Sequence, residues 1–382
     1  MTEVSGAWLE NPRTQSVLSM LTEAGYQAFV VGGAVRDALL DIAVSDVDIA
    51  TDALPETVIA LAQEAGLKAI PTGIDHGTIT VVCGDNGYQI TTFRKDIETD
   101  GRHAVVTFSR TLAEDALRRD FTINALYATA GGHVVDPLGG LPDIAARRVR
   151  FIGLPEDRIR EDSLRILRFF RFHACFSDPL EGIDATALAA CAELADQLET
   201  LSKERIGVEM RKLLGAPDPA PSAASMSTAG ILMRLLPGAS TAGLAPLVHY
   251  ERAIGLAPDW MRRLAVIGGQ NMMENLRLSR SENRQVRLYL TGTASSRSIA
   301  ELAFRHDAKT AQTVELLRAV SFGRDLTPDL IKTTLRAEAM IFPVRAGDLV
   351  GLSGAAIGTR LHELQTQWIA SDFQLSKLDL LK

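Results

Sequence analysis

The spacing of apolar residues along the chain changes near residue 140. Before that point, a buried run at 26–33 and the segment 45–51 predict strands, and two alternating runs within 77–94 predict a hairpin with its turn from Gly84 to Gly87. A helical pattern at 11–25 precedes these strands and another at 52–66 lies between them, with Asp52 as the expected cap of the second helix. The pattern therefore predicts an α/β head with a small mixed sheet over residues 1–140.

After residue 143 the apolar positions recur with helical spacing. The segments 161–176, 184–201 and 203–215 each predict a helix, whereas the Pro, Ala and Ser cluster at 215–230 predicts a linker or long loop. No further strand pattern follows. We therefore expect an all-α remainder, made of a helical neck at 141–215 and a helical body and tail at 216–382.

Composition narrows the class of protein. The 382 residues are 46% hydrophobic and 23% charged, which is typical of a globular protein, and no apolar run approaches the roughly 20 residues of a membrane span. The first 15 residues lack a basic segment followed by an apolar one, so we expect no signal peptide. We therefore expect a cytoplasmic location. Three scattered cysteines give neither a disulfide framework nor a zinc-ligand spacing.

Charge is distributed unevenly. The net charge of −7 disfavours nonspecific attraction to nucleic acid. Residues 147–171, however, contain eight arginines and four acidic residues, which is a local excess of +4. An acidic chain has thus gathered positive charge in one segment.

The stretch from residue 29 to 51 combines two glycines, an arginine and two closely spaced aspartates. On a strand, Asp46 and Asp48 would project from the same face, and two adjacent carboxylates repel unless a cation lies between them. Mg²⁺ suits such a pair, since it binds through one or two carboxylates together with substrate phosphates. Gly32 and Gly33 predict a turn into a helix start that favours an anion, and Arg36 follows one helical turn later.

A second candidate site lies in the segment 161–172. Asp162, Arg165 and Arg168 recur at steps of three, so on one helix they would share a face, with Arg171 continuing the row. Cytosine and adenine both present an amine beside a bare ring nitrogen, which Asp162 and Arg165 could read as acceptor and donor. On this segment alone, a solvated ion-pair face with Glu161 opposite Arg165 is an equal alternative.

These features occur together in an order that resembles a known family. The series GGAVRD followed by DVDIAT resembles the first signature of the nucleotidyltransferase superfamily, in the branch of class II tRNA CCA-adding enzymes and bacterial poly(A) polymerases. Four later segments are similar to the remaining motifs of that branch, namely 118–128, 136–153, 161–172 and, more weakly, 202–214. The resemblance covers roughly residues 28 to 214.

The resemblance implies a nucleotidyltransferase-like head and the addition of nucleotides to tRNA. It implies that Asp46 and Asp48 are catalytic and bind Mg²⁺, and that tRNA, CTP and ATP are the substrates, with no obligate protein partner evident. For nucleotide binding it implies the residues already described and three from the second motif, namely Gly32, Gly33, Arg36, Arg119, Asp120, Asn124, Asp162, Arg165, Arg168 and Arg171. Asp162 and Arg165 would select CTP and ATP.

One departure and two alternatives accompany this resemblance. Relatives carry an acid where this chain has Gln89, so the third carboxylate near the metals is in question. A bacterial poly(A) polymerase shares every motif, although the tail here is not strongly basic, and a noncatalytic RNA-binding relative is the second alternative.

Residues 94–115 resemble the flexible loop of the family, and their presence favours an enzyme that completes the terminal A. His306 with Asp307 lacks the further histidines of a metal-dependent phosphohydrolase, so a surface position is expected for His306.

Overall fold

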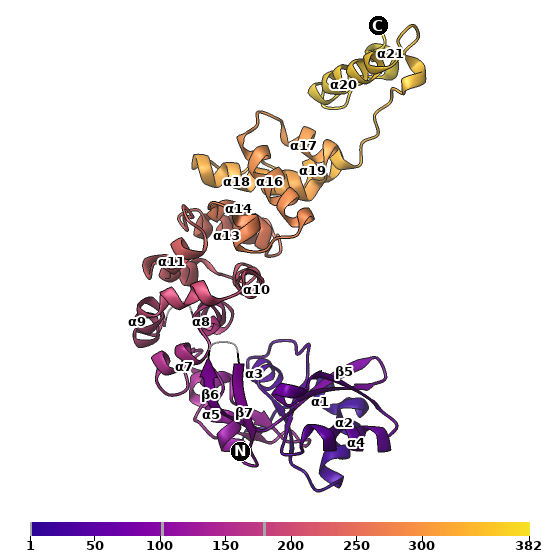
Figure 1. The fold of residues 1–382 in the computed structure, drawn as a ribbon. Helices are drawn as coiled ribbons and strands as arrows, with labels where there is room; N and C mark the ends of the chain where they lie inside the picture. Colours follow the sequence, from indigo (N-terminus) through magenta and orange to yellow (C-terminus); the bar gives the residue numbers. More distant parts are fainter. Residues whose placement is uncertain (1, 101–102, 179–180) are drawn as a thin grey trace. The chain divides into compact units, whose positions relative to one another are not determined.

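The computed structural model describes residues 2–100, 103–178 and 181–382, with the backbone alone at 96–100 and 103–106 (Figure 1). The chain divides into two compact units. Unit 1 comprises Met1–Leu213 and Pro221–Leu232, and unit 2 comprises Leu214–Ala220 and Met233–Lys382. A mixed sheet in the N-terminal part and a mostly helical remainder confirm the predicted fold class.

Unit 1 is built on a seven-stranded mixed sheet. Its strand order is β3-β4-β5-β2-β1-β8-β9, in which β2 runs parallel to β5 and the other neighbours are antiparallel. The strands are β1 (Ala28–Val31), β2 (Asp48–Thr51), β3 (Lys68–Gly73), β4 (Thr78–Cys83), β5 (Asn86–Thr92), β8 (Tyr127–Ala128) and β9 (Val134–Val135). A separate hairpin is formed by β6 (Arg94–Asp100) and β7 (His103–Phe108), beside α5 (Leu112–Leu117) in Figure 1.

The alternation of side chains along the central strands separates two packed faces. Val31 of β1 and Ala50 of β2 share a buried cluster with Phe93, Tyr127 and Ala116, the last from α5. The helices α2 (Pro12–Glu23) and α4 (Pro55–Glu64) contact the sheet through residues outside this cluster. The remaining short helices of the head are α1 (Ala7–Glu10), α3 (Gly33–Leu39), η1 (Ile74–His76), η2 (Thr122–Asn124) and α6 (Leu141–Ala145).

Helices also follow the sheet within unit 1. An aromatic cluster joins them to the head: Phe121 stands beside Phe151 at a centroid separation of 4.8 Å, and Phe172 of α8 lies 5.2 Å from Phe121. The elements here are α7 (Pro155–Glu161), α8 (Leu164–Phe176), α9 (Ala185–Glu193), η3 (Ala195–Thr200), α10 (Lys203–Leu214), α11 (Ala220–Thr228) and α12 (Ile231–Leu235), of which the ends of α10, α11 and α12 extend into unit 2.

Unit 2 is helical throughout its described residues. Its helices are α13 (Leu244–Ala253), α14 (Trp260–Ile267), α15 (Met272–Asn275), α16 (Arg280–Ala294), α17 (Ile299–Arg305), α18 (Ala308–Phe322), α19 (Leu330–Glu338), η4 (Ala346–Asp348), α20 (Ala355–Ala370) and α21 (Lys377–Leu380). Helix α18 is buried along most of its length, and Glu251 of α13 lies buried between Arg262 and Arg263 of α14. His306 is exposed, as the sequence predicted.

Three local expectations were wrong. The segment 161–176 forms two helices, not one, because Asp162 has extended backbone angles (φ −150°, ψ 104°) between α7 and α8. The cluster at 215–230 contains helix α11, since its many alanines favour a helix once Pro221 is placed in the first turn. Asp52 does not cap α4; its carboxylate accepts from the backbone N–H and the side-chain amide of Gln27.

Candidate active site

The glycine turn after β1 brings the first two motifs together. Gly32 has φ 72° and ψ −115°, a conformation that a side chain would strain, and its N–H donates to the carbonyl oxygen of Leu126 at 3.0 Å. A Cβ at Gly32 would lie 3.6 Å from Nη1 of Arg119, and one at Gly33 would lie 3.7 Å from Nη2 of Arg36. The predicted residues Gly32, Gly33, Arg36 and Arg119 are therefore neighbours.

Asp48 begins β2 on the face of the sheet that carries the Val31 cluster. It lies opposite Val31 of β1 and beside Gln89 of β5. Asp46 precedes the strand, so only Asp48 has the strand position that the sequence predicted. Burial raises the pKa of Asp48, and the nearby charge of Asp46 raises it further, while the guanidinium of Arg119 acts in the opposite direction.

Those two carboxylates fit a divalent cation. Both carboxylates are exposed and two positions apart in the chain, and they offer the oxygen ligands that a divalent cation prefers. The adjacent Gln89 adds a neutral amide instead of a third carboxylate, and the described residues contain no group of three or more acidic, histidine or cysteine side chains that could hold a metal. Asp46 and Asp48 are thus the candidate ligands.

Arg119 is fixed by a buried acid that the sequence reasoning missed. Asp115 of α5 is 1% exposed; it accepts from Arg119 Nη2 at 2.9 Å, from Arg118 Nη2 at 2.7 Å and from the Tyr127 hydroxyl at 2.7 Å. Burial alone would raise the pKa of Asp115, but the two guanidinium groups and the hydroxyl lower it to about 2. Asp115 therefore stays charged and holds Arg119 near Asp48.

A chain of hydrogen bonds links four predicted residues. Arg36 Nη1 donates to Asn124 Oδ1 at 2.7 Å, and Asn124 Nδ2 donates to Asp120 Oδ1 at 3.0 Å. Asp120 Oδ2 then accepts from Arg168 Nε at 2.7 Å. The charge of Arg168 and these hydrogen bonds lower the pKa of Asp120 against the effect of its burial. The first, second and fourth motifs are joined in one polar network.

Phe172 organises the arginines of this network. The guanidinium carbon of Arg171 lies 4.2 Å from the ring centroid of Phe172, and those of Arg36 and Arg168 each lie 5.2 Å away. The negative face of an aromatic ring attracts such cations. Arg171 also pairs with Glu209 of α10, at 2.5 Å. Three guanidinium groups thus gather around one ring, and each also pairs with a carboxylate, namely Asp37, Asp120 and Glu209.

The predicted base-reading pair lies at the break between α7 and α8. Asp162 ends α7, whereas Arg165 lies in the first turn of α8, so they are adjacent without sharing a helix. Arg205 of α10 donates through Nη2 to both carboxylate oxygens of Asp162, at 3.1 and 2.8 Å, and the Leu164 N–H donates to Oδ1 at 3.1 Å. The sequence reasoning missed Arg205, although it lies in the fifth motif.

Arg165 is held by three acceptors. Its Nη1 donates to the carbonyl oxygen of Arg158 and to Glu161, and its Nη2 donates to the carbonyl oxygen of Arg118. A guanidinium group has five N–H donors, so Nε–H and one Nη2–H have no partner among the described residues. The ion pair of Glu161 with Arg165, which was the alternative interpretation of this segment, is therefore present. It leaves two N–H groups of Arg165 available for another acceptor.

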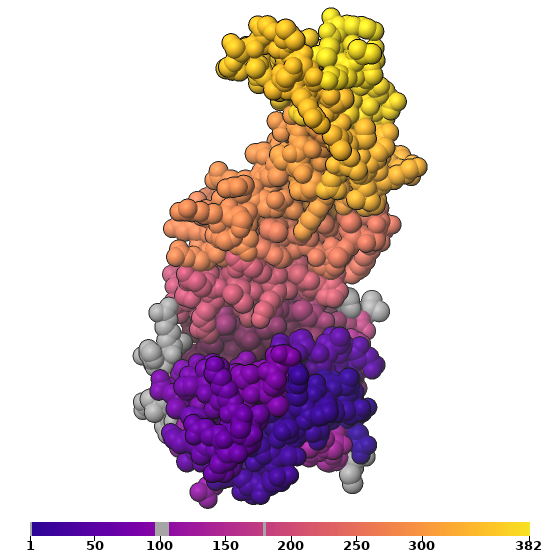
Figure 2. All heavy atoms as spheres, turned by 90° about the vertical axis from the view of Figure 1, so that its right-hand side faces the viewer, coloured from indigo at the N-terminus to yellow at the C-terminus, as the bar shows by residue number. Residues whose placement is uncertain are grey.

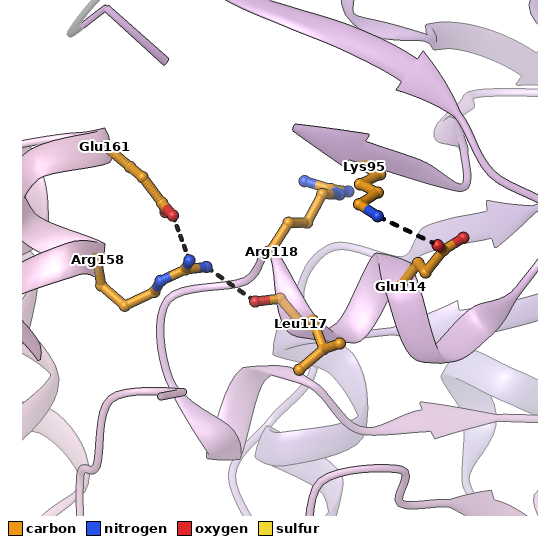
Figure 3. A pocket seen from close by; sticks show the side chains of 6 residues that line it. All are labelled: Lys95, Glu114, Leu117, Arg118, Arg158 and Glu161. Atoms are coloured by element: carbon orange, nitrogen blue, oxygen red, sulfur yellow. Dashed lines mark hydrogen bonds and ion pairs between the residues drawn. The ribbon is translucent and has the colours of Figure 1, made fainter. Parts of the chain in front are cut away.

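A pocket of about 250 Å³ opens beside Glu161, all within unit 1 (Figure 3). Arg158 and Glu161 of α7 face Arg118 and Leu117 at the end of α5 across it, and Arg158 donates to the Leu117 carbonyl oxygen. Lys95 of β6 pairs with Glu114 at its edge, 3.7 Å apart. Glu161, the ion-pair partner of Arg165, thus borders this pocket, whereas Asp162 and Arg165 do not line it.

The described residues contain no helix long and apolar enough to cross a bilayer.

Comparison with known proteins extends these observations. Residues 28–150 match the Poly A polymerase head domain, and residues 182–242 match a probable RNA and SrmB-binding site of polymerase A. A CCA-adding enzyme of Leuconostoc citreum is 44% identical over 230 residues, which cover 59% of this chain and 55% of that relative. The match to this bacterial relative thus spans about half of its length.

A mouse relative matches over nearly the whole chain. The mitochondrial CCA tRNA nucleotidyltransferase 1 of Mus musculus is 33% identical, covering 98% of this chain and 92% of the relative. The crystal structure of the Bacillus stearothermophilus CCA-adding enzyme in complex with CTP superposes with a TM-score of 0.72 at 30% identity, covering 95% and 94% of the two chains. The Thermotoga maritima CCA-adding enzyme, with a TM-score of 0.70 at 20% identity, covers 99% of this chain and 97% of its own and shares the fold. The chain therefore belongs to the class II family of tRNA nucleotidyltransferases and poly(A) polymerases, which includes the CCA-adding enzymes.

Proposed function

We propose that this protein adds CCA to the 3′ end of tRNA, using CTP and ATP and releasing pyrophosphate. The observation that carries the proposal is the combination of a carboxylate pair, a group of arginines around Phe172 and the Asp162 and Arg165 pair within one unit. The similarity to the mouse enzyme over 92% of its length supports it. In this proposal residues 1–140 are the catalytic head, 141–215 the base-reading neck, and 216–382 a body and tail that bind tRNA.

Asp46 and Asp48 would hold Mg²⁺, the divalent ion expected for this pair. When bound, such ions activate the attacking 3′ hydroxyl and neutralise the charge that develops on the leaving pyrophosphate. Arg36, Arg168 and Arg171 bind the triphosphate and thereby orient the α-phosphate. The Asp115 carboxylate keeps Arg119 fixed beside Asp48, so this positive charge needs no reorganisation during the reaction.

The base is read by hydrogen bonds that remain available. Asp162 Oδ2 accepts a hydrogen bond from Arg205 Nη2 and can accept a second one from an exocyclic amine, while the remaining donors of Arg165 can reach a ring nitrogen. Uracil and guanine present a carbonyl and an N–H instead, so both protein groups would lose their partners. Asp120 and Asn124 are placed beside the triphosphate arginines, where they can recognise the ribose.

We further propose a cytoplasmic location, in line with the similarity to bacterial CCA-adding enzymes. The bacterial poly(A) polymerase remains the second candidate, because residues 28–150 match the Poly A polymerase head domain.

One experiment separates these activities. The full chain is incubated with Mg²⁺ and a tRNA transcript lacking its last three nucleotides, with CTP, ATP or both, and the products are resolved at single-nucleotide length. We expect growth by two nucleotides with CTP alone and by three with both. A long ladder with ATP alone would identify a poly(A) polymerase, and no extension would identify a noncatalytic relative.

Substitution of Asp162→Ala is expected to relax base selection. Removing an acceptor that engages the amine costs roughly 1.5–3 kcal/mol, so the preference for CTP over UTP should fall about 10- to 100-fold. The measurement is the ratio of kcat/KM for CTP and UTP. Asp157→Asn, on the exposed Arg160 pair of α7, is the matched control and should keep the ratio. An unchanged ratio with only a slower rate in Asp162→Ala would contradict base reading.

A further inference from the structure

Three arginines form a row on helix α16 of unit 2. Arg280, Arg284 and Arg287 are all exposed, and none of them has a hydrogen-bond or ion-pair partner among the residues that the structure describes. Most other arginines of unit 2 are engaged; Arg262 and Arg263, for example, bind the buried Glu251. The unpaired row therefore differs from the usual pattern of this unit.

Helical geometry places the row on one narrow face. The separations of four and three residues keep the three Cα atoms within an arc of roughly 60° and spread them over roughly 10 Å along the axis. The helix contains one acidic residue, Glu282, which lies on the far side of the cylinder and closes the N-terminal capping box with Ser279. No carboxylate of α16 itself neutralises the row.

The opposite face of α16 is packed tightly, which fixes the direction of the arginines. Val286 and Tyr289 are buried, and Gln285 donates to the Thr310 hydroxyl of α18 at 3.1 Å. A Cβ at Gly292 would lie 2.6 Å from Val314 Cγ2, so α16 and α18 approach each other closely there. Since α16 cannot rotate without losing these contacts, the row is held facing away from α18.

Arg318 of α18 secures the end of the same helix. Its Nη2 donates to the carbonyl oxygens of Gly292 and Ser295, at 2.8 and 2.6 Å, and its Nη1 donates to that of Arg297 at 3.0 Å. These are the orphan carbonyls at and after the C-terminus of α16. Both ends of α16 are thus capped, and the row projects from a rigid element within unit 2, which is part of the surface coloured orange in Figure 2.

A rigid row of unpaired guanidinium groups suits a repeating anion. Arginine matches phosphate geometry with its planar fork of donors. One strand of a duplex presents a phosphate about every 3.4 Å along its axis, so roughly 10 Å of arginines spans several consecutive phosphates. A single small anion would engage only one of the three residues.

We propose that Arg280, Arg284 and Arg287 bind the sugar-phosphate backbone of an RNA duplex. The inference rests on the proposed function for the identity of that RNA, which would be the paired stem of tRNA. The row lies outside residues 182–242, the segment that matches a probable RNA-binding site, so it is an additional surface. Backbone contacts of this kind fix register and carry no sequence readout, in agreement with a partner recognised by shape.

The test is the salt dependence of RNA binding by the full chain. The variant with Arg280→Gln, Arg284→Gln and Arg287→Gln is compared with the unchanged chain, using a tRNA transcript lacking its last three nucleotides. Loss of three phosphate contacts should reduce the slope of log K against log salt concentration by about three and weaken binding about tenfold or more at low salt. At saturating RNA, kcat should be unchanged while KM for RNA rises.

A matched control removes the same charge elsewhere in unit 2. It carries substitutions to glutamine at three exposed cations that already neutralise Asp372, Glu363 and Asp348, namely Arg336, Arg360 and Lys377. This variant should retain most of the salt slope. Because the row makes no hydrogen bond or ion pair with the described residues, its variant should also keep the melting temperature of the unchanged chain.

The possible outcomes test RNA binding by the α16 arginines separately from the proposed CCA addition. An unchanged slope in the row variant, or an equal loss in the control variant, overturns the proposal. An equal loss of affinity for a single-stranded oligonucleotide overturns the assignment to a duplex. If the unchanged chain extends no RNA but its binding depends on the row, the surface stands and the proposed function fails.

Discussion

Nucleotide addition should fall by about 10³-fold or more when Asp48 is replaced by asparagine. The carboxylate pair is the candidate metal site, metal ions contribute several kcal/mol of transition-state charge stabilisation, and each 1.36 kcal/mol is a factor of ten in rate. Asp48 is exposed at the first position of β2. The isosteric amide should therefore leave the fold intact and affect the reaction alone.

The measurement is the single-turnover rate of CTP addition at saturating Mg²⁺, together with the affinity for tRNA. Asp85→Asn is a suitable control, since this exposed carboxylate lies in the turn of the same sheet and pairs with Arg13 at 3.5 Å. Retention of more than about a tenth of the rate by Asp48→Asn, at unchanged tRNA affinity, would contradict the assignment of Asp48 as a catalytic ligand.

Replacement of Asp115 by asparagine should destabilise unit 1 by about 3–5 kcal/mol. Asp115 is buried and accepts from two guanidinium groups and a hydroxyl, and removal of one partner from a buried ion pair leaves the others uncompensated. Arg119 would also lose the contact that fixes it near Asp48, so kcat should fall as well. Chemical denaturation monitored by circular dichroism, together with the addition assay, measures both effects.

A control for this substitution is Asp157→Asn, which removes an exposed pair with Arg160 and should cost less than about 1 kcal/mol. Similar free energies of unfolding for the two variants would show that the buried network around Asp115 does not stabilise the head.

The same carboxylate predicts how stability depends on pH. Its pKa is about 2 in the folded chain and 3.8 for an unperturbed aspartate, so between these values the unfolded chain binds more protons. The stabilising contribution of Asp115, of order 2 kcal/mol, is complete above about pH 4 and is lost as the pH falls toward 2. The stability difference between the unchanged chain and Asp115→Asn should accordingly shrink over that interval. A difference that stayed constant from pH 5 to pH 2 would contradict the lowered pKa.

The sequence by itself determined the fold class and much of the candidate site. The strand at 48–51, the hairpin at 78–92 and the glycine turn at 32–33 follow from apolar alternation and backbone preference, which are properties of adjacent residues. For the same reason Arg165, Arg168 and Arg171 were placed correctly on one helix.

Only the tertiary structure decided which partners hold these residues. Asp115 reaches Tyr127 across 12 positions, Arg205 reaches Asp162 across 43, and Arg168 reaches Asp120 across 48. The backbone is extended at Asp162, whose carboxylate accepts hydrogen bonds from Arg205 and Leu164. The helical spacing of apolar residues does not predict these contacts. Likewise, the unpaired state of the α16 arginines depends on where every nearby carboxylate lies. Local preference acts between neighbours in the chain, whereas ion pairing and burial are set by distances in space, and for that reason only the folded chain could reveal them.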